Sequence, residues 1–225
     1  MRRGWPGTLA HLRHIVFAQF AATGEPPSPA EAATALGVEV SEVISGWREL
    51  HARHQLVLGP GGDAVRMAHP FSAAPMGFVL RAADDRLWWG GCAWDSFGIV
   101  AALGEELEVV TRCPQCQRSV AMQVGPDWPP PPVVVRIPRP AAEWWDDVVA
   151  TCNGIRVVCD ADHAQAFVAR HGLPPGALVD TERLWRLALP WYGDRLDPDY
   201  APHSAAHRRR LLANAGLTGP FWTLS

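Results

Sequence analysis

Apolar residues in the first part of the chain recur every three or four positions, which is the period of one face of an α-helix. They predict a first helix through Leu9, Leu12, Ile15, Val16 and Phe20. A second helix is expected after Ser28, because Ser28-Pro29-Ala30-Glu31 is a capping box with proline at the first helical position, and Gly37 is a stop signal. A third helix is predicted by Val43, Ile44, Trp47 and Leu50.

Two short apolar segments, 56–58 and 64–67, flank a turn with three glycines and therefore predict a hairpin. Three helices followed by a hairpin are typical of a winged helix-turn-helix, a module that usually binds DNA. We assign residues 1–72 to this helical domain. Six arginines and six acidic residues balance each other through residue 70, whereas a helix that reads a DNA groove needs cations facing phosphates. Nucleic acid is therefore an unlikely partner, and we expect only weak binding without sequence preference.

After a predicted linker at 69–75, the pattern changes to short apolar runs that predict strands. These runs are 78–80, 87–89, 107–110, 119–124 and 133–137. Helices are expected between and after them, so we predict an α+β domain over 73–189, with a mixed sheet of four to six strands. A helix after Asp160 should stop at Gly172, and a further helix, 182–189, should end at Pro190.

The stretch from Leu87 to Asp95 carries the strongest chemical signal in the chain. An apolar strand turns on Gly90 and Gly91, after which Cys92 and Asp95 would share one face of a helix. The helix dipole should lower the pKa of the Cys92 thiol. A thiolate beside a carboxylate can bind a soft metal and pass a proton. The alternative interpretation is a small buried thiol and a solvated carboxylate.

The other cysteines leave several interpretations open. Cys113 and Cys116 have the Cys-x-x-Cys spacing of half a zinc site, whose second half would come from Cys152 and Cys159. A redox pair and a pair that hands over a metal are alternatives. We place Cys152 at the mouth of a strand and expect Cys159 to lie deeper, in the core.

The last segment, 190–225, reads as an extension rich in aromatic residues and proline. Two roles are open for it: covering the active site or making a dimer contact. Within it, the segment 207–212 predicts a short exposed helix.

Composition narrows the class of protein further. The chain has 225 residues, 48% of them hydrophobic and 19% charged, which is ordinary for a soluble globular protein of one or two domains. A net charge of −3 argues against nucleic-acid binding driven by bulk charge. No apolar run is long enough to span a membrane, and Met1–Pro6 leads into no signal peptide. We expect a cytoplasmic protein whose five cysteines serve metal binding or catalysis rather than disulfides.

Three elements together, the Gly-Cys92-Ala-Trp-Asp95 turn, Cys113 and Thr151-Cys152, resemble the organomercurial lyases, or alkylmercury lyases. Phe167 and His171-Gly172 follow at similar spacing, and the resemblance covers roughly residues 9–187. It implies that the N-terminal helical domain is a structural partner of a catalytic domain and that Cys113 is structural. Two departures are Trp94, where a smaller aliphatic residue is familiar, and the extension 190–225.

The resemblance also implies a reaction, protonolysis of a carbon–mercury bond. Cys92 and Cys152 would bind mercury as thiolates, and Asp95 would deliver the proton to carbon and add an oxygen ligand to the metal. No organic cofactor is needed. The expected partners are a small organomercurial substrate and, as acceptor of the metal, a thiol or mercuric reductase.

Two other functions remain open at this point. An enzyme of the same fold could use the Cys–Asp–Cys site on a different substrate in specialised metabolism. A metal or thiol sensor could use the helical domain to read DNA. Binding to one operator would favour the sensor, and release of hydrocarbon from an organomercurial would favour the lyase.

Overall fold

The computed structural model describes residues 9–224. The Met1–Pro6 segment and Ser225, the end of the predicted extension, lie outside the described residues. The α-helices are α1 (Leu9–Thr23), α2 (Pro29–Leu36), α3 (Val40–Ala52), α4 (Ala93–Leu103), α5 (Val148–Gly154), α6 (Ala161–His171), α7 (Thr181–Tyr192) and α8 (Ala205–Asn214). The strands are β1 (Val57–Leu58), β2 (Val65–Ala68), β3 (Phe71–Ser72), β4 (Phe78–Arg81), β5 (Leu87–Gly90), β6 (Leu107–Arg112), β7 (Ser119–Val124), β8 (Val134–Ile137), β9 (Arg156–Val158) and β10 (Ala177–Asp180). Short 3₁₀ turns occur at Ala141–Glu143 and Pro220–Trp222.

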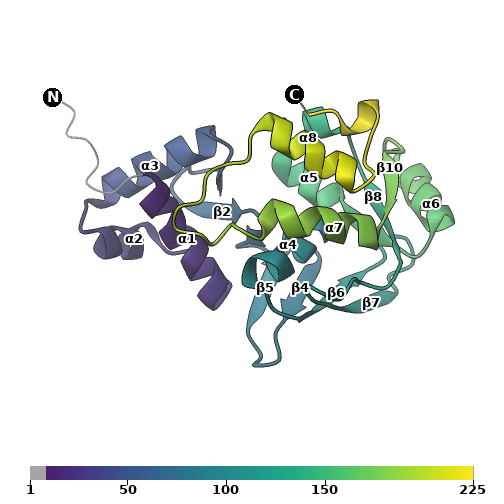
Figure 1. Ribbon diagram of the computed structural model, residues 1–225, viewed down its shortest axis with the longest axis horizontal. Helices are drawn as coiled ribbons and strands as arrows, with labels where there is room; N and C mark the ends of the chain where they lie inside the picture. Colours follow the sequence, from purple (N-terminus) through teal and green to yellow (C-terminus); the bar gives the residue numbers. More distant parts are fainter. Residues whose placement is uncertain (1–8, 225) are drawn as a thin grey trace.

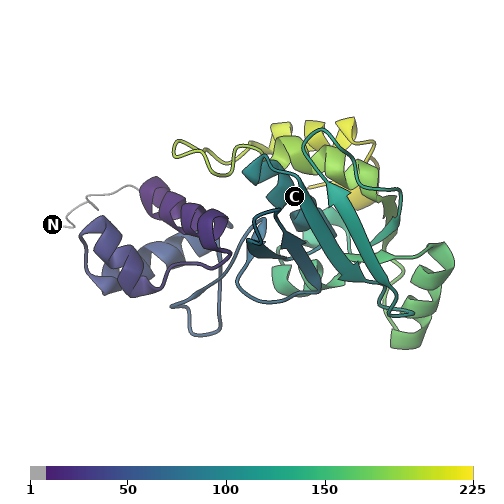
Figure 2. The ribbon, with the colours of Figure 1, turned by 90° about the horizontal axis from the view of Figure 1, so that it is seen from below.

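Helices α1, α2 and α3 lie together at one end of the molecule (Figures 1 and 2). The capping box predicted for α2 is present: the Ser28 hydroxyl accepts from the Glu31 backbone N–H at 3.2 Å, and the Glu31 carboxylate accepts from the Ser28 N–H at 2.7 Å. Gly37 ends the helix in the left-handed conformation. Hence these local signals, together with the hairpin β1–β2, form in the order predicted from the sequence.

The larger sheet runs from this hairpin into the rest of the chain, in the order β1-β2-β3-β5-β4-β6-β7. Strand β3 occupies part of the segment that we predicted as a linker, and it pairs with both β2 and β5. A second sheet has the order β10-β8-β9. All strand pairs among the described residues are antiparallel, so the prediction of a mixed sheet was wrong, although the α+β class is confirmed. Short loops connect four of the eight strand pairs, β1–β2, β2–β3, β4–β5 and β6–β7, and such connections favour antiparallel pairing.

The N-terminal helices share a hydrophobic core with the sheet. Phe71 on β3 stacks on Phe20 of α1, with ring centroids 5.6 Å apart, and Trp88 on β5 donates its indole N–H to the Phe20 carbonyl at 2.9 Å. Burying aromatic rings and satisfying the indole N–H fix the helices against the sheet. The domain boundaries at 72/73 and 189/190 therefore stay predictions. The segments on either side of 72/73 are packed together in one core.

Helix α4 packs on the sheet, and α7 crosses over α4 (Figure 1). Close approach of the two helices requires Gly98, because a Cβ there would lie 2.5 Å from the ring of Tyr192 and 2.8 Å from Pro70. Helix α7 does not end at Pro190 as predicted but continues to Tyr192. Proline removes one backbone N–H from the helix. The helical hydrogen bonding resumes after it, because the Gly193 N–H donates to the Leu189 carbonyl at 3.0 Å.

Within residues 9–224, no helix combines the length and the apolar character needed to cross a membrane.

Candidate active site

The site is built on the turn between β5 and α4. Cys92 is the N-cap of α4, and its sulfur accepts from the Asp95 backbone N–H at 3.3 Å. Gly91 precedes it in a place with no room for a side chain: a Cβ would lie 2.6 Å from the Asp95 carboxylate and 2.5 Å from the end of Met67. The absence of a side chain at Gly91 thus lets the backbone pass directly beside the carboxylate.

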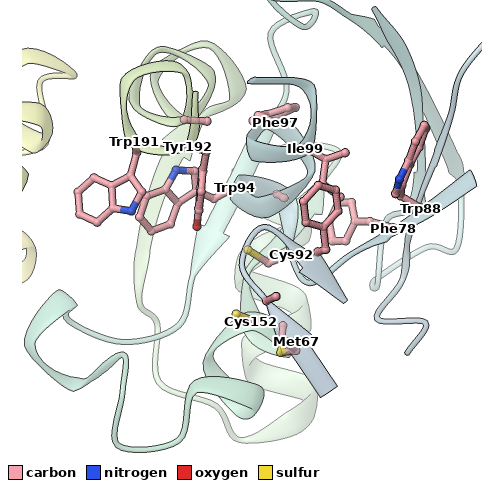
Figure 3. Close-up of a cluster of buried hydrophobic side chains, with 14 of the residues drawn as sticks. Met67, Phe78, Trp88, Cys92, Trp94, Phe97, Ile99, Cys152, Trp191 and Tyr192 are labelled. Atoms are coloured by element: carbon pink, nitrogen blue, oxygen red, sulfur yellow. The ribbon is translucent and has the colours of Figure 1, made fainter. Parts of the chain in front are cut away.

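The structure brings together the three residues that the sequence predicted as a site. The Cys92 thiol donates to Asp95 Oδ2 at 3.2 Å, and the Cys152 thiol lies 3.6 Å from the same oxygen. Figure 3 shows the side chains of Cys92 and Cys152 close to each other at the base of α4. All three residues are buried, with exposed fractions of 1% for Cys92 and Asp95 and 6% for Cys152. Cys152 lies in helix α5 rather than at the mouth of a strand, so that part of the prediction was wrong.

Two further residues complete the cluster. His69 Nε2 lies 3.4 Å from the Cys152 sulfur, and the Tyr192 hydroxyl donates to Asp95 Oδ1 at 2.8 Å. Sequence reasoning missed both, because His69 lay in the predicted linker and Tyr192 beyond the proline that was expected to end α7. The continuing apolar period of α7, which places Leu184, Leu187, Ala188 and Trp191 on its buried side, was the available signal for Tyr192.

The predicted lowering of the Cys92 pKa was wrong. Burial raises the pKa of Cys92 well above its ordinary value, and the hydrogen bond with Cys152 and the charge of Asp95 raise it further. A helix N-terminus is worth about 0.3–1 kcal/mol, less than the cost of burying a charge. The hydrogen bond from Cys92, followed by the charge and contact of His69, lowers the pKa of Cys152. Of the two thiols, Cys152 is therefore the more acidic.

His69 supplies the matching positive charge. Burial alone lowers the pKa of its imidazole, but the negative charges of Asp95 and Cys152 outweigh burial and raise the pKa to about 9. A cationic imidazole 3.4 Å from the Cys152 sulfur favours the thiolate form of Cys152, and such a pairing activates cysteines as nucleophiles and metal ligands.

A cavity of about 320 Å³ opens onto the cluster. Its floor is aromatic, because the Trp94 ring packs against Trp144, Trp191 and Tyr192 with centroids 5.3, 5.0 and 5.5 Å away (Figure 3). The N-terminal helical segment and the C-terminal extension both reach its rim, contributing Arg53, His54, Tyr200, His203 and Arg208. Of the two roles open for the extension, the structure supports covering the site. Helix α8 is not simply exposed, since Leu211 and Leu212 are buried.

The remaining three cysteines form a separate group. Cys113, Cys116 and Cys159 lie with His163, and one ligand atom of each is within 4.8 Å of the others. Cys159 is half-buried at the end of β9, so its predicted place in the core was wrong. Cys152 belongs to the cluster with His69 and Asp95, so the structure does not support the alternative of a zinc site that includes Cys152.

Comparisons with known proteins agree with this geometry. A solved structure described as the mercury-bound form of MerB2 is 20% identical to the chain and matches it with a TM-score of 0.60, covering 86% of this chain and 91% of that chain. At this identity the likeness establishes the fold. No curated protein sequence matches the chain significantly. The family model for alkylmercury lyase (MerB) matches residues 71–193, more than half of the chain and all of the segment from β3 to the end of α7. The chain therefore belongs to the alkylmercury lyase family, whose members act on carbon–mercury bonds.

Proposed function

We propose that this protein cleaves the carbon–mercury bond of a small organomercurial by protonolysis. One observation carries the proposal: a single buried carboxylate oxygen, Asp95 Oδ2, lies within 3.6 Å of two thiol sulfurs at the base of an aromatic cavity. Thiolates are the ligands that soft metals prefer, and the carboxyl group is placed to exchange a proton with whatever the thiols hold.

Capture begins at Cys152, because its thiol is the more acidic of the two. The Cys152 thiolate displaces the leaving ligand of R–Hg–X and forms Cys152–S–Hg–R. Cys92 then passes its proton to Asp95 Oδ2 along the 3.2 Å hydrogen bond and binds mercury as the second thiolate. Donation by two sulfurs raises the electron density on the metal and weakens its bond to carbon.

Protonolysis follows from the newly protonated Asp95. Its proton moves to the carbon atom, the electron pair of the carbon–mercury bond takes up that proton, and the products are R–H and Hg(II) bound by two thiolates. Asp95 is again a carboxylate. The cycle needs no organic cofactor, and we propose that a thiol, or mercuric reductase, removes the metal.

Tyr192 is a positioning residue in this scheme. Its hydroxyl binds Asp95 Oδ1 and so leaves Oδ2 facing the two sulfurs. We expect Tyr192→Phe to lower kcat about 10-fold, the size expected for a lost hydrogen bond to a charged group. Mercury affinity should change less than about threefold, because the sulfurs are untouched.

The matched control is Tyr200→Phe, which alters the chain's second tyrosine at the rim of the cavity. That variant should keep parental kcat, and rapid-quench measurement of hydrocarbon release separates the two. Equal rates for Tyr192→Phe and the parent would show that Asp95 is oriented without the hydroxyl.

The aromatic floor of the cavity indicates that the organic group is apolar and favours aryl or short alkyl groups. The direct test is incubation of reduced protein with phenylmercury and an excess of small thiol while benzene is measured by gas chromatography. We expect repeated turnover, with one benzene released for each mercury transferred to thiol. Protein that binds phenylmercury and never releases benzene or, with methylmercury, methane would exclude the lyase and favour another substrate for the same site.

A further inference from the structure

The turn between β6 and β7 has the shape of a metal-binding knuckle. Cys113 and Cys116 stand at its start, with two residues between them, and Gln117 adopts a left-handed backbone conformation with φ 61°. The Gln117 N–H donates to the Cys113 carbonyl at 2.9 Å, and the Cys113 N–H donates to the Arg118 carbonyl at 3.0 Å. This tight turn presents both sulfurs to the same neighbour.

That neighbour is the start of α6. Cys159 directly follows β9. Asp160 caps the helix by accepting from the His163 N–H at 2.8 Å, so His163 lies in the first turn of α6. The spacing Cys-x-x-Cys followed by Cys-x-x-x-His is typical of zinc sites. The Cys116 and Cys159 sulfurs are 3.6 Å apart. Tetrahedral coordination with Zn–S bonds of about 2.3 Å separates two ligands by ~3.8 Å, in agreement with this distance.

Little else holds this region in place. Cys113, Val158 and Ala164 form a small apolar cluster apart from the main core, and Ala164 is the one buried residue of α6. Helix α6 lies at the periphery of the molecule in both views (Figures 1 and 2). His163 Nδ1 is buried without a hydrogen-bond partner, and the Asp160 carboxylate lies 3.3 Å from it.

We propose that Cys113, Cys116, Cys159 and His163 bind one structural zinc ion that joins the β6–β7 turn to helix α6. Four protein ligands close the coordination sphere, so the ion has no open position for a reactant and its role is to stabilise the fold. The ion replaces the hydrophobic contacts that this small cluster lacks. This site shares no ligand with the Cys92–Asp95–Cys152 cluster and is independent of the proposed carbon–mercury chemistry.

The test is the metal content of the full-length protein, produced in zinc-supplemented medium and purified under reducing conditions. We expect about one zinc per chain by mass spectrometry of the metal. Exchange for Co²⁺ should give the absorption spectrum of a tetrahedral thiolate complex. In zinc-loaded protein, the exposed Cys116 and the half-buried Cys159 should resist alkylation and become reactive when a chelator is added. This protection experiment needs no variant and so does not depend on a variant's folding.

Variants sharpen the assignment. We expect His163→Gln to weaken zinc affinity at least ~100-fold, about 2.7 kcal/mol, and Cys159→Ser to behave likewise. His171→Gln, at the exposed end of the same helix, and Cys92→Ser should retain full zinc. Fewer than about one zinc in ten chains, with no tetrahedral cobalt spectrum, would overturn the proposal. A Cys116–Cys159 disulfide that persists through purification under reducing conditions would also overturn the proposal and would favour a redox pair.

Discussion

Asp95→Asn is expected to retain mercury and to lose turnover. We predict Hg(II) affinity within about tenfold of the parent, roughly 1.4 kcal/mol, and a fall of at least ~100-fold in organomercurial cleavage, the low end for loss of a general acid. Mercury prefers sulfur, so removing a carboxylate oxygen costs little once two thiolates are bound. Removing the proton carrier stops the step that breaks the bond to carbon.

The structure makes this substitution a clean one. The amide oxygen of the introduced asparagine can still accept from Tyr192, which binds Asp95 Oδ1 at 2.8 Å in the parent, so the side chain should keep its orientation. Affinity is measured by competition with a small thiol, and cleavage is measured as benzene release in a single turnover. Parental turnover in the Asp95→Asn variant would show that another group donates the proton to carbon. His69, whose imidazole lies beside Cys152, is the group to replace next, as His69→Gln combined with Asp95→Asn.

Loss of either thiol of the site should abolish tight mercury binding. We expect reduced protein to bind one Hg(II) at this site and Cys92→Ser or Cys152→Ser to weaken that binding on the order of 10³-fold, about 4.1 kcal/mol. An alcohol oxygen is a poor ligand for a soft metal, and each variant leaves a single thiolate. Cys152→Ser should also slow capture more than Cys92→Ser, because Cys152 has the more acidic thiol.

The measurement compares mercury bound per chain between parent and variant under competing thiol. Mercury held by Cys113, Cys116 and Cys159 then contributes equally to the parent and to the two active-site variants. Cys116→Ser is the control, since its exposed sulfur lies in the other cluster. If both active-site variants hold mercury as tightly as the parent, the two-thiol site is wrong.

The sequence was sufficient wherever one helical turn or one hairpin decides the outcome. The Ser28 capping box formed as expected, and Gly37, Gly104 and Gly172 end their helices in the left-handed conformation. Cys92 and Asp95 meet because they are three residues apart at the start of one helix. These outcomes depend on backbone geometry that a few neighbouring residues determine.

Tertiary packing decided the rest of the site. Cys152, His69 and Tyr192 reach Asp95 from separate elements that are 57, 26 and 97 residues away along the chain. No local sequence pattern predicts these contacts. They depend on how three elements pack around α4: the turn after β2, α5 and α7. Cys159 and His163 meet the Cys113–Cys116 turn in the same way, across two sheets.

The acidity of the thiols shows the difference most clearly. From the sequence, the helix N-terminus predicts that Cys92 carries the thiolate, since the dipole is a local effect. In the folded protein Cys92 is buried against the charge of Asp95, while the neighbouring Cys92 and His69 lower the pKa of Cys152. Desolvation and the charges of distant residues act over the whole packed environment and exceed the dipole of one helical turn. The sequence by itself determined that Cys92 and Asp95 lie together at the start of one helix, and the tertiary structure decided which thiol of the site is the more acidic, because that acidity depends on what the fold packs around each sulfur.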